Sequence, residues 1–392
     1  MLRSFKGARI TTTAILAVGM AALSLGIQSG GVASAASKKS SFVIGVPLPM
    51  TGAEASAGTE MFNGMKLAVN QINKAGGLLG HEVVLNEQDS ACDATTAVNA
   101  ANLLVSNRVN AIAGEYCSSA ALPEEPIFSR ANLPVVFSAA NSPALLSSKY
   151  RNTFLTLASG SGDAAEAAGF FKQVMKETKI AIVDDQSAYG VAIAQAMQQD
   201  VRSSGMTVAG GAIQAVPDTQ TDFSSVISAI QSSGATGIFW TGYFAQAALF
   251  VKQLAAAGVK ATFVGSEAAI DQTFITGAGA AAEGTYATEF TTPTTKATTV
   301  FNRLYRKTFH SAPGPYSSYA YDSIKILANA VMRAKSIKSA KIIAALRKTH
   351  MSGVTGRIEF SPQGARLGLP EEVLVVKNGQ YVRNPVQPKV KS

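Results

Sequence analysis

The feature that most restricts the fold of this 392-residue chain is a regular alternation of two kinds of segment. Short apolar runs rich in β-branched residues, such as FVIGVPL (42–48) and LPVVFSA (133–139), alternate with longer Ala-rich amphipathic stretches, such as 57–77 and 94–107. This alternation is typical of βαβ units, in which parallel sheets carry helices on both faces. We therefore predict an α/β fold.

A second series with the same pattern begins near residue 160. Its predicted strands are KIAIVDD (179–185), TGIFWTGY (236–243) and ATFVGSE (261–267), and amphipathic segments separate them. Glycines suited to left-handed caps mark helix ends at Gly76, Gly205, Gly234 and Gly258. Without an N-terminal leader, roughly 355 residues remain, which is more than a domain with a single hydrophobic core ordinarily contains. We therefore predict two doubly wound lobes.

The C-terminal part departs from this rhythm. After two helical stretches, GRIEFSPQG (356–364) and EEVLVVKNGQYV (371–382) have the pattern of strands, and Asn378 with Gly379 predicts a hairpin turn. No Pro- or Ser-rich linker divides the chain at its midpoint. This favours two lobes joined by several short connections, with the late strand pair crossing back between them.

Residues 1–35 have the pattern of a secretory signal peptide, because three basic residues precede the apolar run ILAVGMAALSLGI and the small residues ASA. The run is short for a membrane span, and no later segment sustains about 18 apolar residues without charges. No cysteine lies near the cleavage site, so no lipid anchor is expected. We predict an exported, untethered, periplasmic protein.

Removal of this leader takes the charges of Arg3, Lys6 and Arg9 from the formal net charge of +9 and leaves +6. The other Lys and Arg residues are scattered, with small clusters only in SKKSS and QPKVKS. A nucleic-acid-binding stripe is therefore not expected.

The chain has two cysteines, and in an oxidising compartment these are most simply interpreted as one disulfide. Cys92 and Cys117 would close a loop of about 26 residues, which the loop-entropy model values at roughly 3 to 4 kcal/mol. A catalytic thiol would need a histidine partner, and His81, His310 and His350 lie in no recognisable motif. A zinc site would need clustered ligands, which the sequence lacks, and no metal or cofactor is predicted.

Sequence motifs of enzymes are missing. There is no GxSxG, HExxH or Walker motif, and GAGAAAEG (277–284) has too few glycines for a dinucleotide fingerprint. We predict that the protein is not an enzyme and name no catalytic residue.

Binding is better supported. The segment CSSAALPEEPIFSRA follows an apolar strand and opens a helix, with Ser118 or Ser119 as the predicted N-cap. A helix N-terminus can bind a carboxylate, although these serines could equally do no more than cap their own helix.

Other candidates follow predicted strands, where α/β sheets place ligand crevices. Ala139 offers a carbonyl, and Asn141 and Ser142 offer side-chain oxygens, unless Asn-Ser-Pro is only a turn. Glu267 could face a ligand ammonium or be a solvated loop residue. The candidate pocket aromatics are Tyr189, Tyr243 and Tyr316.

Taken together, these residues resemble the leucine/isoleucine/valine-type substrate-binding proteins of ABC importers, which are type I periplasmic binding proteins. The resemblance covers nearly the whole mature chain. It rests on the order and spacing of VPLPMTGAEASAGTEMFNGMKLAVNQINKAGGLLG, DSACDATTAVNAANLLV, GEYCSS, DDQSAYG, GSEAAID and AAEGTYAT. It implies a Cys92–Cys117 disulfide, two lobes with three hinge crossings, and a ligand cleft between the lobes.

The resemblance also implies roles. Ser118 is similar to the residue that holds an amino-acid carboxylate, Ala139 to the one whose carbonyl receives the ammonium, and Glu267 to its counter-charge from the other lobe. The tyrosines resemble residues that close over the ligand. The implied lobes are 37–158 with 290–371, and 159–289 with 372–392.

Two positions differ from the family pattern. Asn141 replaces a usual threonine, and Ala57 stands where many members carry an aromatic ring, so the ligand's identity stays open. We expect a monomeric binding protein that delivers an amino acid, branched-chain or related, to an ABC permease. The alternatives are a ligand-sensing module of the same fold that binds an amide or another small metabolite, and a secreted hydrolase with Ser118 as nucleophile.

Overall fold

The computed structural model describes residues 40–147 and 149–390, so the predicted signal peptide lies outside the described residues. The first of two large sheets has five parallel strands in the order β2-β1-β3-β4-β5. Its strands are β1 (Phe42–Leu48), β2 (Val83–Asp89), β3 (Ala111–Gly114), β4 (Val135–Phe137) and β5 (Thr153–Leu155).

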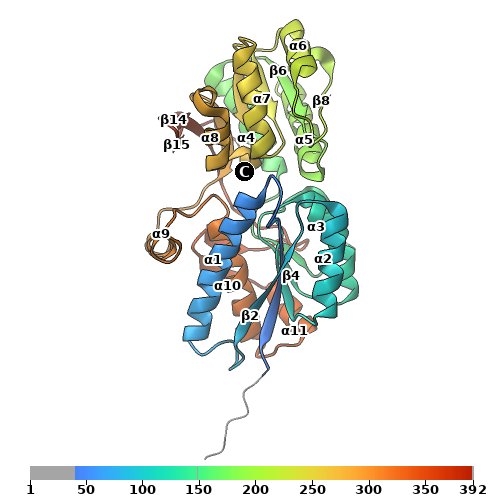
Figure 1. Ribbon diagram of the computed structural model, residues 1–392, viewed down its shortest axis with the longest axis vertical. Helices are drawn as coiled ribbons and strands as arrows, with labels where there is room; N and C mark the ends of the chain where they lie inside the picture. The colour runs from blue at the N-terminus through green and yellow to red at the C-terminus, as the bar shows by residue number, and fades with distance from the viewer. Residues whose placement is uncertain (1–39, 148, 391–392) are drawn as a thin grey trace, which may run out of the picture. The chain divides into compact units, whose positions relative to one another are not determined.

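Helices cover both faces of this sheet (Figure 1). α1 packs against α10 and α9, α2 packs against α3, and α11 packs against α10. We call these elements the first lobe. Its helices are α1 (Ala55–Lys74), α2 (Ala94–Ser106), α3 (Ser118–Arg130), α9 (Lys296–Phe309), α10 (Ser317–Ala334) and α11 (Ser339–Leu346); it also holds η1 (Pro143–Leu146) and the strand pair β12 (His350–Gly353) and β13 (Gly356–Glu359).

The second sheet has eight strands in the order β15-β14-β11-β10-β9-β6-β7, and β8 also pairs with β6. It is mixed, not purely parallel as predicted, because the hairpin β14–β15 adds to β11 in antiparallel fashion. Its strands are β6 (Lys179–Asp184), β7 (Thr207–Val208), β8 (Gln214–Ala215), β9 (Gly237–Trp240), β10 (Thr262–Gly265), β11 (Tyr286–Phe290), β14 (Glu371–Lys377) and β15 (Gln380–Arg383).

This sheet and its helices form what we call the second lobe, in which α4 packs against α5 and α7 against α8. The helices are α4 (Ser161–Gly169), continued by the π-helical segment η2 (Phe170–Met175), α5 (Ala188–Ser203), α6 (Ser224–Ser233), α7 (Phe244–Ala256) and α8 (Gln272–Ala278); the short 3-10 segments are η3 (Ala209–Gly211), η4 (Glu267–Ala269) and η5 (Gly279–Ala282). The predicted α/β fold is confirmed.

Local sequence signals explain the element ends. All four predicted cap glycines have positive φ, and Gly234, with φ of 66°, is the C-cap of α6. Asn378 and Gly379 also have positive φ, and they join Lys377 to its cross-strand partner Gln380, which confirms the predicted hairpin.

Within the described ranges, no helix is both long enough and apolar enough to cross a membrane. The strands of both sheets are lined by fully buried aliphatic and aromatic side chains, among them Phe42, Phe137, Phe239 and Trp240. The loops that follow β3, β4, β6, β9 and β10 hold the polar residues described next.

Candidate functional site

The start of α3 lies directly after β3, at the carboxyl end of the first sheet. Cys117 is the N-cap, with extended backbone angles and no side-chain capping bond, and Ser118 is the first helical residue. The prediction of Ser118 or Ser119 as N-cap is therefore wrong by one or two positions. Because the helix begins earlier, the Ser118 hydroxyl is free to accept a hydrogen bond from the Ser142 N–H (3.2 Å).

A disulfide joins Cys117 to Cys92, with a Cα–Cα distance of 5.4 Å. Cys92 lies three residues after the end of β2, so the bond ties the loop after one strand to the first residues of the helix after another. The disulfide prediction is confirmed. The bond fixes the start of α3 beside the site.

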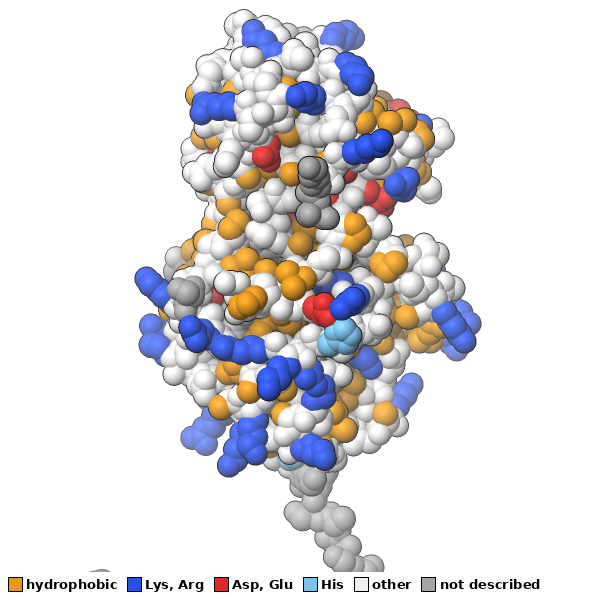
Figure 2. Space-filling view, turned by 180° about the vertical axis from the view of Figure 1, so that it is seen from behind, with side chains coloured by type: hydrophobic (Ala, Val, Ile, Leu, Met, Phe, Trp, Pro, Cys, Tyr) orange, Lys and Arg blue, Asp and Glu red, His pale blue; other side chains and the backbone are white. Residues whose placement is uncertain are grey.

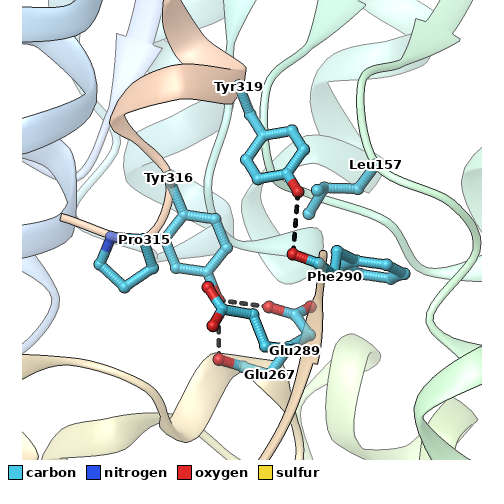
Figure 3. Close-up of a pocket in the computed structure, with 7 residues that line it drawn as sticks. All are labelled: Leu157, Glu267, Glu289, Phe290, Pro315, Tyr316 and Tyr319. Carbon is cyan, nitrogen blue, oxygen red and sulfur yellow. Dashed lines mark hydrogen bonds between the residues drawn. The ribbon is translucent and has the colours of Figure 1, made fainter. Parts of the chain in front are cut away.

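Glu267 lies at the centre of the site, at the start of η4 in the second lobe, and it is 4% exposed. Asn141 of the first lobe donates from Nδ2 to its Oε1 (3.1 Å). The Tyr316 hydroxyl, at the N-terminus of α10, is placed to donate to Oε2 and to the Glu267 carbonyl oxygen, the latter at 2.9 Å (Figure 3). Residues of the first lobe thus bind this carboxylate of the second lobe.

The pKa of Glu267 is raised to about 7, chiefly because burial disfavours the charged form, while hydrogen bonds from Tyr316, Asn141 and Tyr189 act in the opposite direction. Within the described residues, Glu267 forms no ion pair with a basic side chain. A ligand ammonium would supply the missing positive charge and favour the ionised form.

Four tyrosines form a contiguous cluster around this carboxylate. The Tyr116 ring centroid lies 5.0 Å from that of Tyr316 and 5.4 Å from that of Tyr243, and Tyr243 lies 5.4 Å from Tyr189. The predicted aromatics therefore lie together. Sequence reasoning missed Tyr116, although it directly precedes Cys117 in GEYCSS.

Ser119 and Ser142 lie at the contact between lobes. The Ser119 hydroxyl accepts from the Ala188 N–H (3.0 Å), and the Ser142 hydroxyl donates to the Ala188 carbonyl (3.2 Å). Ala188 is the first residue of α5 in the second lobe. Ala139, just past β4, is buried, and its N–H donates to the Glu115 carbonyl (3.1 Å).

Sequence reasoning also missed Asp163, a fully buried residue of α4. Its Oδ1 accepts from the Glu267 N–H (3.2 Å) and from the Thr288 hydroxyl. Burial, and next the charge of Glu267, raise its pKa well above the usual range. Asp163 therefore positions the backbone of Glu267 through this hydrogen bond.

The open space beside Glu267 is small. A cavity of about 10 Å³, room for about one water molecule, is lined by Leu157, Glu267, Glu289, Phe290, Pro315, Tyr316 and Tyr319 (Figure 3). Tyr319 donates to the Phe290 carbonyl (3.1 Å) at its far side. Beside Glu267, where a ligand would lie, the side chains of the two lobes therefore form hydrogen bonds with each other.

The chemistry offered is that of binding. Hydroxyl and amide donors lie beside a buried carboxylate, which suits a molecule with both an anionic and a cationic group. The three histidines lie elsewhere: His310 and His350 are exposed, and the His81 ring contacts the Ser40 carbonyl at 2.5 Å. In the described ranges, no group of three or more His, Cys, Asp or Glu residues is arranged to hold a metal ion.

Known proteins with related sequences are amino-acid-binding proteins. The chain is 28% identical over 338 residues to a leucine-, isoleucine-, valine-, threonine- and alanine-binding protein of Pseudomonas aeruginosa, covering 85% of this chain and 89% of that protein. It is 31% identical over 255 residues to a Leu/Ile/Val-binding protein homolog of Brucella melitensis, covering 65% and 68%. These relatives are binding proteins and not enzymes, which agrees with the prediction from sequence.

The fold also matches a solved structure, that of a leucine-binding protein from Thermotoga maritima. The TM-score is 0.83 at 25% identity, with 88% of this chain and 98% of that chain covered. The model of the family described as periplasmic binding protein matches residues 41–380. Because this match covers residues 41–380, most of the sequence, the chain belongs to the periplasmic binding protein family.

Proposed function

We propose that this protein captures an amino acid between its two lobes and delivers it to the permease of an ABC transporter. The observation that carries the proposal is Glu267, a buried carboxylate of the second lobe that Asn141 and Tyr316 of the first lobe bind and that forms no ion pair within the described residues. The ligands named for its relatives, leucine, isoleucine and valine, have the matching ammonium group.

The proposed ligand contacts follow from the groups at the strand ends. The ligand carboxylate binds at the N-terminus of α3, to Ser118, Ser119 and the Ser142 hydroxyl, where free N–H groups and the helix dipole favour an anion. The ammonium binds Glu267 and the carbonyl of Ala139. Asn141, which now donates to Glu267, turns to the ligand when the ammonium takes its place.

Ligand binding then acts by a population shift. Because its carboxylate binds the first lobe and its ammonium binds the second, the ligand stabilises the arrangement in which the lobes are in contact. The proposed lobes are 37–158 with 290–371, and 159–289 with 372–392. The chain crosses between them after β5, after β11 and before β14, three short connections that permit a hinge movement.

The proposal includes export and a monomeric state. Residues 1–35 act as a cleaved signal peptide, and the mature protein works in the periplasm as a monomer without nucleic acid. On the face seen in Figure 2, Lys and Arg are numerous and Asp and Glu few. Such a surface suits a protein that stays in solution and docks on a membrane partner through one end.

The test is a calorimetric titration of the mature protein with leucine and with its 2-keto acid, which lacks the ammonium. We expect binding of the amino acid and none of the keto acid. Glu267→Gln keeps the shape of the side chain and should weaken leucine binding by at least about 2 kcal/mol, because it removes a buried counter-charge.

Glu125→Gln is the matched control, because Glu125 is also fully buried but lies in the body of α3, away from the site. It should leave leucine affinity unchanged. Equal binding of leucine and its keto acid would remove Glu267 from its proposed role. Failure of every amino acid to bind would refute the function.

A further inference from the structure

A second buried carboxylate, Glu54, lies at the edge of the same site. It is the N-cap of α1 and is 8% exposed, yet its side chain makes no capping bond. Its Oε2 is buried and has no hydrogen-bond partner within residues 40–147 and 149–390. A buried carboxylate oxygen without a partner is costly. Glu124 and Glu125 of α3 share this property; Glu54 differs from them because the turn that follows it contacts the second lobe through Ser56.

Two acidic residues influence Glu54. Burial, and next the charges of Asp271 and Asp185, raise its pKa to about 8. Asp185 follows β6, and Asp271 is the N-cap of α8, so both belong to the second lobe. We call Glu54, Asp185 and Asp271 the outer acidic cluster.

The outer acidic cluster has no ion-pair partner in the part of the chain that the structure describes. The buried charged residues of the described part are all carboxylates except Arg366, which instead donates to Thr156 and Thr355 of the first lobe. Lys and Arg lie on the outer surface, as Figure 2 shows for one face.

Two tyrosines connect the outer acidic cluster to Glu267. After burial, the charge of Glu54 is the largest influence that raises the pKa of Tyr116, and the charges of Asp185 and Glu54 are the largest for Tyr243. These two rings lie 5.4 Å apart, and the Tyr116 hydroxyl is itself buried without a partner in the described ranges. Aromatic faces beside carboxylates suit an alkylammonium or guanidinium group.

Ala57, three residues after Glu54 in the first turn of α1, has a single methyl group as its side chain. This turn also reaches the second lobe, since the Ser56 and Thr273 hydroxyls lie 3.5 Å apart. Glu54 therefore faces α8 across the contact between the lobes.

We propose that the ligand carries a second cationic group, on its side chain, and that Glu54 binds this group together with Asp185, Asp271 and the rings of Tyr116 and Tyr243. The inference rests on the proposed function and specifies its substrate class: amino acids with a basic side chain, rather than the purely apolar ones. The second cation joins Glu54 of the first lobe to Asp185 and Asp271 of the second, so it adds to the stabilisation of lobe contact.

The test compares two ligands with the same carbon chain, L-lysine and L-norleucine, in calorimetric titrations of the mature wild-type protein. Norleucine lacks only the terminal ammonium group. We expect lysine to bind at least about tenfold more tightly. Glu54→Gln should weaken lysine binding by a similar factor and change norleucine binding less than about threefold. Glu125→Gln, the same change in a buried carboxylate of α3, should preserve the preference for lysine.

Each outcome separates this inference from the proposed function. If norleucine bound the wild type as tightly as lysine, the proposed recognition of a second cationic group would be wrong, and the proposed binding of amino acids would still stand. A preference for lysine that persists in Glu54→Gln would overturn the assignment of this residue. If neither ligand nor any other amino acid bound, the proposed function would fail, and the inference with it.

Discussion

Loss of the Cys92–Cys117 disulfide is expected to lower stability without changing ligand choice. The bond spans a sequence separation of 25 residues. Cross-linking over such a loop removes about 12 cal/mol/K of entropy from the unfolded chain, which corresponds to about 3.5 kcal/mol at 25 °C. The effect acts mainly on the unfolded state, so contacts of the folded site are unaffected.

The corresponding change in melting temperature follows from the unfolding entropy, about 2.1 cal/mol/K per residue. If all the ordered residues unfold as one unit, Tm falls by about 5 °C; if the first lobe unfolds alone, it falls by about 8 °C. Cys92→Ser is the variant of choice. Serine at 117 would stand at the N-cap of α3, where its hydroxyl could cap the helix and regain about 1 kcal/mol.

The assay is thermal unfolding followed by circular dichroism, for wild type, Cys92→Ser, and wild type with reductant, with thiols counted after unfolding. The reduced wild type should melt with the variant, and neither should lose more than about threefold in ligand affinity. From the same unfolding entropy, a Tm of Cys92→Ser within about 1 °C of that of the oxidised wild type would refute the stabilising role of the disulfide. A large loss of affinity at unchanged Tm would instead make the disulfide a determinant of site geometry.

Two further predictions concern stability. Burial raises the pKa of Glu115 to about 7 and that of Glu289 to about 8, so the folded state keeps protons that the unfolded chain releases near pH 4.5. Their stabilising contribution is thus complete below about pH 4.5 and lost as pH rises through 8; Tm should fall between pH 5 and pH 8, and a rise would contradict this sign. Asp322 is fully buried and accepts from the Val354 N–H (3.1 Å) and the Thr355 N–H (2.9 Å) and hydroxyl. Asp322→Ala should cost about 3 to 5 kcal/mol in urea unfolding, because those donors lose their acceptor and buried Arg366 loses a nearby negative charge, and Asp322→Asn should cost less; equal costs would show that the charge, not the hydrogen bonds, matters.

The sequence alone determined the α/β class and the placing of most helices and strands. These depend on local periodicity, 2.0 residues in strands and 3.6 in helices, and on glycine caps such as Gly234. It also located Asn141 and Glu267, because both follow apolar strands and the carboxyl ends of parallel strands share one edge of a sheet. The disulfide followed from there being two cysteines.

Only the tertiary structure decided which of these groups meet. Asn141 and Glu267 are 126 residues apart, and Asp163 and Glu267 are 104 apart, so no local pattern contains their hydrogen bonds. The raised pKa of Glu267 comes from burial, which depends on the packing of both lobes. Likewise, Glu54 has the appearance of an ordinary helix-start carboxylate until the fold buries it near Asp185 and Asp271, without an ion-pair partner among the described residues.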